Sequence, residues 1–253
     1  MKILKKKELK SKINFYKLNG WVKIEKFLNY EEIKKIKHEI EFFLSSTFKK
    51  YDRRDINFTS SKNVNKDINS FHKMHDCLWI KNFANQKKIK RLIKLFLEKE
   101  PELRASEYFA KPKKKGLPAP THQDNFYWKV KNNKGLTMWI ALCASDKKNG
   151  GVYYYNGSHK KGVLPHRASL AKGTSQMIKN LSSLKRFKKI TPSLKTGDIL
   201  IHHALVVHGS KKNISHRPRK GLTFQFKDKN TDYIKSAIKI YEKSLRKQIE
   251  LRV

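Results

Sequence analysis

The stretch Thr121-His122-Gln123-Asp124-Asn125-Phe126-Tyr127-Trp128 offers an imidazole and a carboxylate two residues apart, in a segment whose pattern predicts extended backbone. In an extended segment His122 and Asp124 project from the same face. They can bind one metal ion if a third ligand comes from elsewhere, and His208, in His208-Gly209-Ser210, is the candidate. Two histidines and one carboxylate leave one face of an octahedral iron(II) open for a cosubstrate and dioxygen, a ligand set typical of non-haem iron oxygenases.

The length and composition predict one domain over residues 1–253. A chain of 253 residues with 38% hydrophobic content is long enough for one sizeable core. It has no run of eighteen or more apolar residues, and no apolar segment follows its basic N-terminus. Two cysteines, Cys77 and Cys143, are too few for a disulfide framework or a thiolate metal site, so we expect them to have packing roles. These features predict a cytoplasmic protein without a membrane span.

The formal net charge of +38 would by itself suggest nucleic acid or an anionic surface as a partner. Lys greatly outnumbers Arg, however, and the lysines spread through the chain with many Ile and Asn, as expected of drift in an AT-rich genome. Proteins that read nucleic acids tend to concentrate Arg for bidentate contacts. The alternative interpretation is therefore a metal-free basic β-barrel that binds nucleic acid, with Tyr153-Tyr154-Tyr155 as its stacking platform.

The first hundred residues are predicted to be mainly helical. After a lysine-rich lead and a short strand near Trp21, Asn29 can cap a helix that has Glu31 and Glu32 in its first turn. Residues 45–70 are polar and predict a loop. Residues 86–98 show the apolar periodicity of a second amphipathic helix.

From Leu103 onward the periodicity changes toward two, which predicts a mainly β fold with flanking helices. Short apolar runs alternate with turns, and several strands at this spacing suggest a sandwich or jelly roll. The core is expected over about 103–226, and a C-terminal helix over 231–251. The predicted strands are 103–110, 121–130, 136–143, 151–155, 174–178, 188–194, 198–203, 205–208 and 221–226.

Several histidines compete for the third ligand position. His202 and His203 face opposite ways if they lie on one strand, so at most one of them points inward. His208 is favoured because Gly209 follows it and allows close backbone approach. His72 and His75 form a second possible metal pair, but no third ligand has comparable context, and we interpret them as packing or surface residues.

A basic cluster follows the last histidine, and in it Arg217 competes with Arg219. Either guanidinium can grip the distal carboxylate of a dicarboxylic cosubstrate through two parallel hydrogen bonds. Lys111 and the lysines at 113–115 would suit an anionic substrate, although the overall lysine bias explains them equally well.

Seven features in a fixed order carry a resemblance to a known family. They are Leu18-Asn19-Gly20-Trp21-Val22, Lys111-Pro112, His122-Gln123-Asp124, Trp139-Ile140-Ala141-Leu142, Asn149-Gly150-Gly151, Gly157-Ser158-His159-Lys160 and Arg219. Through them the chain resembles the phytanoyl-CoA dioxygenase family of iron(II)- and 2-oxoglutarate-dependent oxygenases, which includes ectoine hydroxylase-like enzymes.

The resemblance implies a double-stranded β-helix (jelly roll) in which His122, Asp124 and His208 hold Fe(II). It further implies that Arg219 binds the 5-carboxylate of 2-oxoglutarate and that Ser210 assists it. The expected reaction uses O2 to hydroxylate a C–H of a small molecule and releases succinate and CO2.

Two further residues are interpreted through the same resemblance. Trp128 is expected to line the cosubstrate pocket. His159 is expected to be structural, because its turn is architectural in the family. The oligomeric state is left open.

Overall fold

The computed structural model describes residues 6–52, 54–60, 63, 67–169, 171 and 175–250. Its helices are α1 Lys6–Asn19, α2 Tyr30–Thr47, α3 Leu78–Ala84, α4 Lys87–Leu97, α5 Asp124–Trp128 and α6 Lys235–Glu250, with short 3-10 turns η1 Phe48–Lys50, η2 Met74–Asp76, η3 Lys131–Asn133, η4 Ser158–Lys161 and η5 Ser182–Leu184. Its strands are β1 Trp21–Ile24, β2 Ile56–Phe58, β3 Ile68–Phe71, β4 Pro101–Lys111, β5 Ala119–His122, β6 Gly135–Ala141, β7 Val152–Tyr155, β8 His166–Ala168, β9 Gln176–Ile178, β10 Lys189–Ile190, β11 Ile199–His203, β12 His208–Ser210 and β13 Arg219–Asp228.

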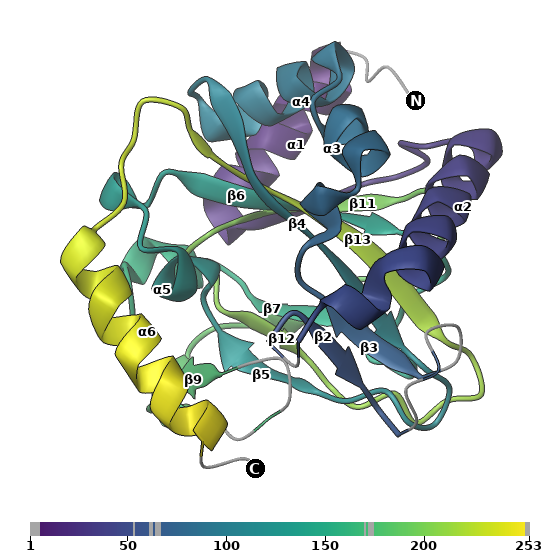
Figure 1. Cartoon of the computed structure of the whole chain (residues 1–253). Coiled ribbons are helices and arrows are strands. Elements are labelled where there is room, and N and C mark those ends of the chain that lie inside the picture. Colours follow the sequence, from purple (N-terminus) through teal and green to yellow (C-terminus); the bar gives the residue numbers. More distant parts are fainter. Residues whose placement is uncertain are drawn as a thin grey trace.

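Two antiparallel sheets make up the centre of the molecule (Figure 1). The larger has seven strands in the order β1-β11-β6-β13-β4-β3-β2, and the smaller has four in the order β10-β7-β12-β5. Strands β8 and β9 form a separate pair. The crossing connections and antiparallel pairing are those of a double-stranded β-helix. The prediction of a mainly β jelly roll with flanking helices is confirmed.

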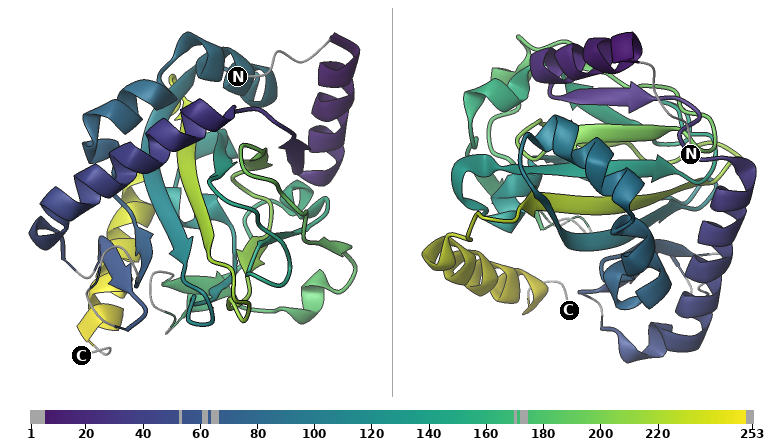
Figure 2. Two further views of the ribbon diagram at one scale, coloured as in Figure 1. Left: turned by 90° about the vertical axis from the view of Figure 1, so that its right-hand side faces the viewer. Right: turned by 90° about the horizontal axis from the view of Figure 1, so that it is seen from above.

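The two faces of the larger sheet have different chemistry because side chains alternate along its strands. On β6, Leu136, Met138 and Ile140 are fully buried against the helices, as are Leu222 and Phe224 on β13. The same hydrophobic cluster takes residues from α1, α2, α3 and α4. Figure 2 shows α3 and α4 lying across this sheet. Burial of this outer face therefore attaches the helical layer to the strands.

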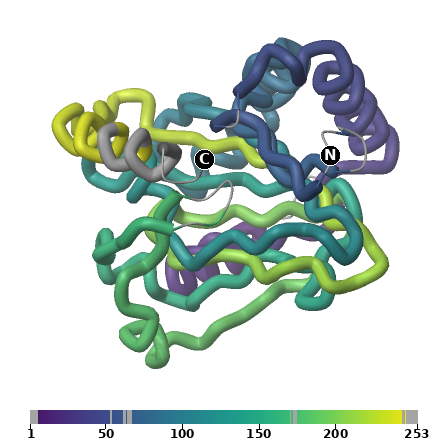
Figure 3. The backbone as a smooth tube through the Cα atoms, turned by 60° about the horizontal axis from the view of Figure 1, so that its bottom comes forward, coloured from purple at the N-terminus to yellow at the C-terminus, as the bar shows by residue number. Residues whose placement is uncertain are grey.

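The opposite face of the larger sheet looks toward the smaller sheet. Thr137 and Trp139 of β6 lie on this face, and Trp139 packs with Tyr154 of β7 and Trp21 of β1 in a second apolar cluster. Helix α6 lies at the left of the molecule and α2 at the right (Figures 1 and 3). In the part of the chain that the structure describes, no helix combines the length and apolarity that a membrane crossing requires.

The helices predicted at 29 onward and at 86–98 are confirmed, the first with a complete capping box. The Asn29 side chain accepts from the Glu32 amide at 2.9 Å, and the Glu32 carboxylate accepts from the Asn29 amide at 3.0 Å. The lysine-rich lead is a helix, α1, and the region predicted as a loop over 45–70 contains the end of α2 and the strands β2 and β3. The sequence did not predict β2 and β3 because this segment is polar and each strand is too short to show an alternating pattern.

The prediction of extended backbone over 121–130 is wrong after His122. Residues Asp124–Trp128 form the short helix α5, which ends at Lys129 with a positive φ of 56°. The Asn125 side chain stabilises this turn, since its Oδ1 accepts from the Val130 amide and its Nδ2 donates to the Val130 carbonyl, each at 3.1 Å. Local side-chain bonds of this kind compete with strand pairing.

Other boundaries also differ from the prediction. The strand predicted over 188–194 is limited to Lys189–Ile190. Residues 204–207 form a turn, and β12 begins only at His208. The C-terminal helix begins at Lys235, because residues near Tyr233 pair instead with the backbone around Val130.

Candidate metal centre and active site

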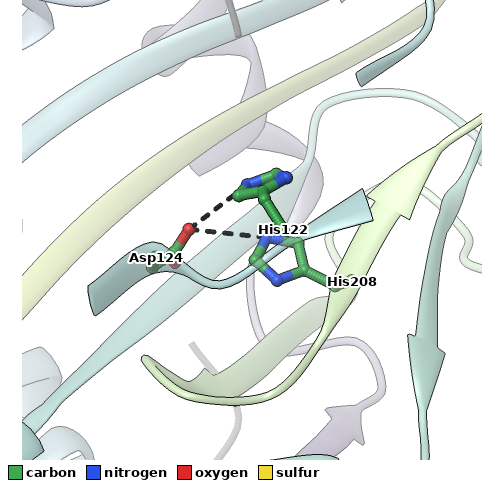
Figure 4. A group of neighbouring side chains, drawn as sticks. All are labelled: His122, Asp124 and His208. Carbon is green, nitrogen blue, oxygen red and sulfur yellow. Dashed lines mark ion pairs between the residues drawn. The ribbon is translucent and has the colours of Figure 1, made fainter. Parts of the chain in front are cut away.

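Three side chains converge where β5, α5 and β12 meet (Figure 4). His122 ends β5 and is the direct antiparallel partner of His208 at the start of β12. Asp124 begins α5 and turns back toward both. Its Oδ1 lies 3.6 Å from His122 Nε2 and 3.5 Å from His208 Nε2. One ligand atom from each residue lies within 4.8 Å of the others. His122 and Asp124 therefore face the same point, as the sequence analysis expected, but the turn into α5 brings them together and not an extended segment.

Both histidines present an unprotonated Nε2 atom that can bind a metal. The Nδ1 of His122 lies 2.7 Å from the Pro120 carbonyl, and the Nδ1 of His208 lies 3.0 Å from the Val206 carbonyl. A carbonyl oxygen only accepts, so each Nδ1 carries the proton and each Nε2 keeps a free lone pair. Bonds of this kind fix the tautomer and ring orientation of metal-binding histidines.

The Asp124 carboxylate is oriented by its other oxygen. Its Oδ2 accepts from Thr137 Oγ1 at 2.7 Å and from His202 Nε2 at 3.1 Å. The His202 ring is held in turn by Tyr154, whose hydroxyl lies 3.0 Å from His202 Nδ1. Oδ1 is therefore the oxygen left facing the two free Nε2 atoms.

The protonation states also suit a cation. Burial lowers the pKa of His208 to about 3, so its imidazole is neutral at neutral pH. Burial acts to raise the pKa of Asp124, but the opposing effect of the surrounding histidines, among them the His202 Nε2–H that donates to Oδ2, is larger and holds that pKa well below its usual range. Metal bonds of about 2.1 Å place neighbouring octahedral ligand atoms about 3.0 Å apart. The observed gaps of 3.5 and 3.6 Å therefore need to close by about 0.5–0.6 Å.

The competition among the histidines of β11 is resolved by their opposite orientations. His202 is buried and faces the centre, where it supports Asp124, whereas His203 faces α1 and accepts from the Leu205 amide at 3.0 Å. The sequence analysis considered His202 only as a rival ligand and missed its supporting contact. Its place on β11, in the other sheet from the first ligand strand β5, was not readable from spacing.

Arg219 lies inside the cavity, and Arg217 does not. The buried Arg219 guanidinium donates to the Gly150 carbonyl through Nε at 3.2 Å and Nη2 at 3.0 Å, and it lies 5.4 Å from the centre of the Trp139 ring. Burial lowers its pKa to about 10, which still leaves it charged at neutral pH. The exposed Arg217 instead pairs with Asp146 at 2.5 Å.

A cavity of about 700 Å³ joins these parts. It is lined by all six residues that the sequence analysis assigned to the site, namely His122, Asp124, His208, Arg219, Ser210 and Trp128. Gly209 allows β12 to pack closely against Tyr153 of β7, since a Cβ at position 209 would lie only 2.6 Å from the Tyr153 hydroxyl. Ordinary side chains do not fit at such a distance, so glycine is required at this position.

A polar group on the far wall of the cavity was missed. Arg104, Glu107, Gln225 and His72 line it together with Thr223. A signal existed, because Thr223 and Gln225 alternate with the fully buried Leu222, Phe224 and Phe226 along β13. Polar residues at every second position of an otherwise apolar strand indicate a face that meets a cavity.

The other candidate histidines have structural contacts. His72 Nδ1 lies 2.9 Å from Glu107 Oε1, and the Ser106 amide donates to His75 Nδ1 at 3.3 Å. Among the described residues only one group of three or more His, Cys, Asp and Glu side chains could hold a metal, and it is the one formed by His122, Asp124 and His208. His159 Nε2 lies 3.2 Å from the Lys17 carbonyl, a contact that ties its turn to α1.

The nucleic-acid interpretation is not supported by the tyrosine run. Tyr153 and Tyr154 are buried, with 7% and 0% of their surface exposed, so the three rings cannot form a stacking platform. Lys111 is also buried and donates to the Lys211 carbonyl at 2.6 Å, and it is not among the residues that line the cavity.

Comparison with known proteins agrees with this geometry. The model of the phytanoyl-CoA dioxygenase (PhyH) family matches residues 16–221. The peroxisomal phytanoyl-CoA dioxygenase of Bos taurus is 24% identical over 231 residues, covering 87% of this chain and 68% of the relative. A probable alpha-ketoglutarate-dependent hypophosphite dioxygenase of Stutzerimonas stutzeri is 28% identical over 208 residues, covering 78% and 70%.

The fold is likewise shared with solved structures. The epimerase SnoN in complex with Fe3+, alpha ketoglutarate and nogalamycin RO superposes with a TM-score of 0.70, at 19% identity over 89% of this chain and 85% of that one. The family match covers most of the chain and contains all three converging side chains. The protein belongs to the phytanoyl-CoA dioxygenase family.

Proposed function

We propose that the protein is an Fe(II)- and 2-oxoglutarate-dependent dioxygenase that hydroxylates a C–H of a small molecule and releases succinate and CO2. The observation that carries this proposal is the convergence of two free imidazole Nε2 atoms and one carboxylate oxygen in a cavity that also contains a buried guanidinium. Family membership and the alpha-ketoglutarate-dependent relative in Stutzerimonas stutzeri support it.

In this proposal His122, Asp124 and His208 hold iron(II). When bound there, iron supplies the activation of O2 that amino-acid side chains cannot provide. Thr137 and His202 keep Asp124 Oδ1 turned toward the metal through their bonds to Oδ2.

Arg219 is proposed to bind the distal carboxylate of 2-oxoglutarate. Its Nη1 makes no hydrogen bond to the described residues, while the bonds to Gly150 fix the plane of the guanidinium. A charge-assisted bond in a buried site is stronger than one in water. Ser210, which lines the same cavity, is proposed to assist it.

Aromatic side chains line part of the cavity, and they favour the exclusion of water that this chemistry requires. Trp128, Trp139 and Tyr127 line the cavity, and the Tyr127 hydroxyl donates to the Gln176 carbonyl at 2.8 Å. On one side α6 adds Tyr241, whose ring lies 5.7 Å from that of Tyr127. Exclusion of water in this way protects reactive species from side reactions.

The single-domain organisation over 1–253 is part of the same proposal. One hydrophobic cluster joins residues of the four N-terminal helices with strands β4, β6, β11 and β13. The helical part and the jelly-roll part thus share a core. The cytoplasmic location stays a prediction from the sequence.

The test is succinate formation from 2-oxoglutarate by the iron-loaded protein, measured in air with and without a panel of small acids. We expect the rate of succinate formation by Asp124→Ala to be at least about 100-fold lower than that of wild type, because the substitution removes one of three metal ligands. Asp232→Ala is a matched control, since that exposed carboxylate pairs with Lys131 at 3.8 Å and does not line the cavity, and it should keep the wild-type rate. Equal turnover by Asp124→Ala and wild type would rule out the assigned ligand set.

A further inference from the structure

The far wall of the cavity holds a cation whose hydrogen-bonding capacity is largely unused. Arg104 of β4 donates from Nη1 to Gln225 Oε1 at 2.5 Å, and its guanidinium carbon lies 5.1 Å from the centre of the Trp128 ring. Its Nε is shielded from water and has no hydrogen-bond partner among the described residues. The five N–H donors of a guanidinium are normally satisfied when they leave water.

The nearest carboxylate in the cavity is already engaged. Glu107 Oε2 accepts from Gln225 Nε2 at 2.6 Å, and Glu107 Oε1 lies 2.9 Å from His72 Nδ1. Burial opposes the charged imidazole, but Glu107 outweighs it and raises the pKa of His72, which favours the ion pair. The Gln225 amide therefore stands between Arg104 and Glu107, and Arg104 has no ion pair with any described residue.

An unpaired guanidinium in a partly buried wall is energetically unfavourable. Burial lowers the pKa of Arg104, against the opposing effect of Glu107. An unsatisfied buried donor destabilises the folded protein, and it does so more strongly when the group is charged. A bound oxyanion would satisfy these donors, so the wall is arranged to gain stability from an anionic ligand.

The position of Arg104 separates it from the proposed cosubstrate site. Gln225, which holds Arg104, is the direct cross-strand partner of Thr137, which donates to Asp124. Arg219 lies six residues earlier on β13, on the same face, which corresponds to about 20 Å along the strand. The register therefore places Arg104 near the Gln225–Thr137 level, where Thr137 contacts Asp124, and Arg219 toward the other end of this face of β13, and both arginines line the same cavity.

We propose that Arg104 binds an oxyanionic group of the primary substrate, either a carboxylate or a phosphonate-type group. The adjoining apolar part of that substrate packs on Trp128 and Tyr127, which line the same part of the cavity. This assignment rests on the proposed function, in which 2-oxoglutarate occupies the Arg219 end of the cavity.

Binding of matched neutral and anionic probes tests the proposal without turnover. Two series of probes are titrated calorimetrically into protein loaded with Mn(II) and saturating 2-oxoglutarate. Each series has a carboxylate, a phosphonate and a neutral amide: octanoate, octylphosphonate and octanamide in the first, and phenylacetate, benzylphosphonate and phenylacetamide in the second. We expect an anion of at least one series to bind at least tenfold more tightly than its amide. A preference limited to the carboxylate or to the phosphonate identifies which oxyanion the site takes.

Two variants locate the effect. Arg104→Gln should reduce the preference for the anion over the amide to about twofold or less, while Arg104→Lys, which keeps the charge, should retain part of it. Arg91→Gln, at an exposed position on α4, is the matched control and should bind as wild type does. Thermal unfolding of each variant checks that it is folded.

Three results would overturn the assignment of Arg104: equal binding of anion and amide, no binding of any anion, or an unchanged preference in Arg104→Gln. Failure of the proposed function would be seen separately, as absence of 2-oxoglutarate binding and of succinate formation. Repeating the titrations on metal-free protein keeps the two outcomes distinct.

Discussion

Replacing Thr137 with valine removes one hydroxyl and leaves the shape of a buried side chain nearly unchanged. That hydroxyl donates to Asp124 Oδ2 at 2.7 Å, and Thr137 is only 3% exposed, so water cannot easily take its place. A hydrogen bond to a charged group contributes about 1.5–3 kcal/mol. This range corresponds to about a 10- to 100-fold loss of iron(II) affinity in Thr137→Val, which agrees with the usual effect of removing a partner of a metal ligand.

The assay is anaerobic competition for iron(II) between the protein and a chelator of known affinity. Thr223→Val is the matched control, because Thr223 lines the same cavity but its hydroxyl donates to the Glu107 carbonyl at 3.2 Å instead of to a proposed ligand. The control should stay within about twofold of wild type. Iron(II) affinity in Thr137→Val equal to that of wild type would refute the claim that this hydroxyl orients Asp124.

Three further predictions concern the cosubstrate, pH and the metal. Arg219→Gln should raise the KM for 2-oxoglutarate by at least 100-fold in the succinate assay, and Arg217→Gln by less than threefold; the reverse order would move the carboxylate anchor to Arg217. Burial holds the pKa of His203 at about 3 and of His166 at about 4, below the value of about 6.5 expected in the unfolded chain. Below pH 6.5 the unfolded state therefore binds more protons than the folded state, and the free energy of unfolding should decrease between pH 7 and pH 4. Urea titrations of metal-free protein measure this free energy. A value that stays constant over this range would contradict the assigned burial. Saturating Mn(II) should raise the Tm of wild type and leave that of Asp124→Ala unchanged, because only a native-state site stabilises by mass action, and an equal rise in both would place the metal elsewhere.

The period-two pattern predicted much of the sheet architecture. Along β6 and β13 the apolar residues that alternate with Thr137, Trp139 and Gln225 are those buried against the helices. The helix capped by Asn29 was predictable because its cap and first-turn contacts are local in sequence. Patterns of this kind are set by neighbouring residues, and sequence displays them directly.

What the sequence did not reveal depends on partners distant along the chain. The backbone around Asp124 was predicted as extended, but the Asn125 amide donates to the Ala204 carbonyl at 2.9 Å, a contact invisible to local pattern. The contact of His202 with Asp124 brings β11 and α5 together, and that of Arg104 with Gln225 joins β4 and β13, so both depend on elements far apart in sequence. These contacts are also the ones that orient the site, which is why spacing alone found its ligand candidates and missed their supports.

Diffraction at the iron absorption edge, from crystals grown anaerobically with Fe(II) and 2-oxoglutarate, tests the central claim most directly. The account predicts one anomalous peak within about 2.3 Å of His122 Nε2, Asp124 Oδ1 and His208 Nε2, with the distal carboxylate of 2-oxoglutarate on Arg219. A peak that lacks any one of these three ligand atoms, or a metal bound elsewhere on the chain, would contradict it.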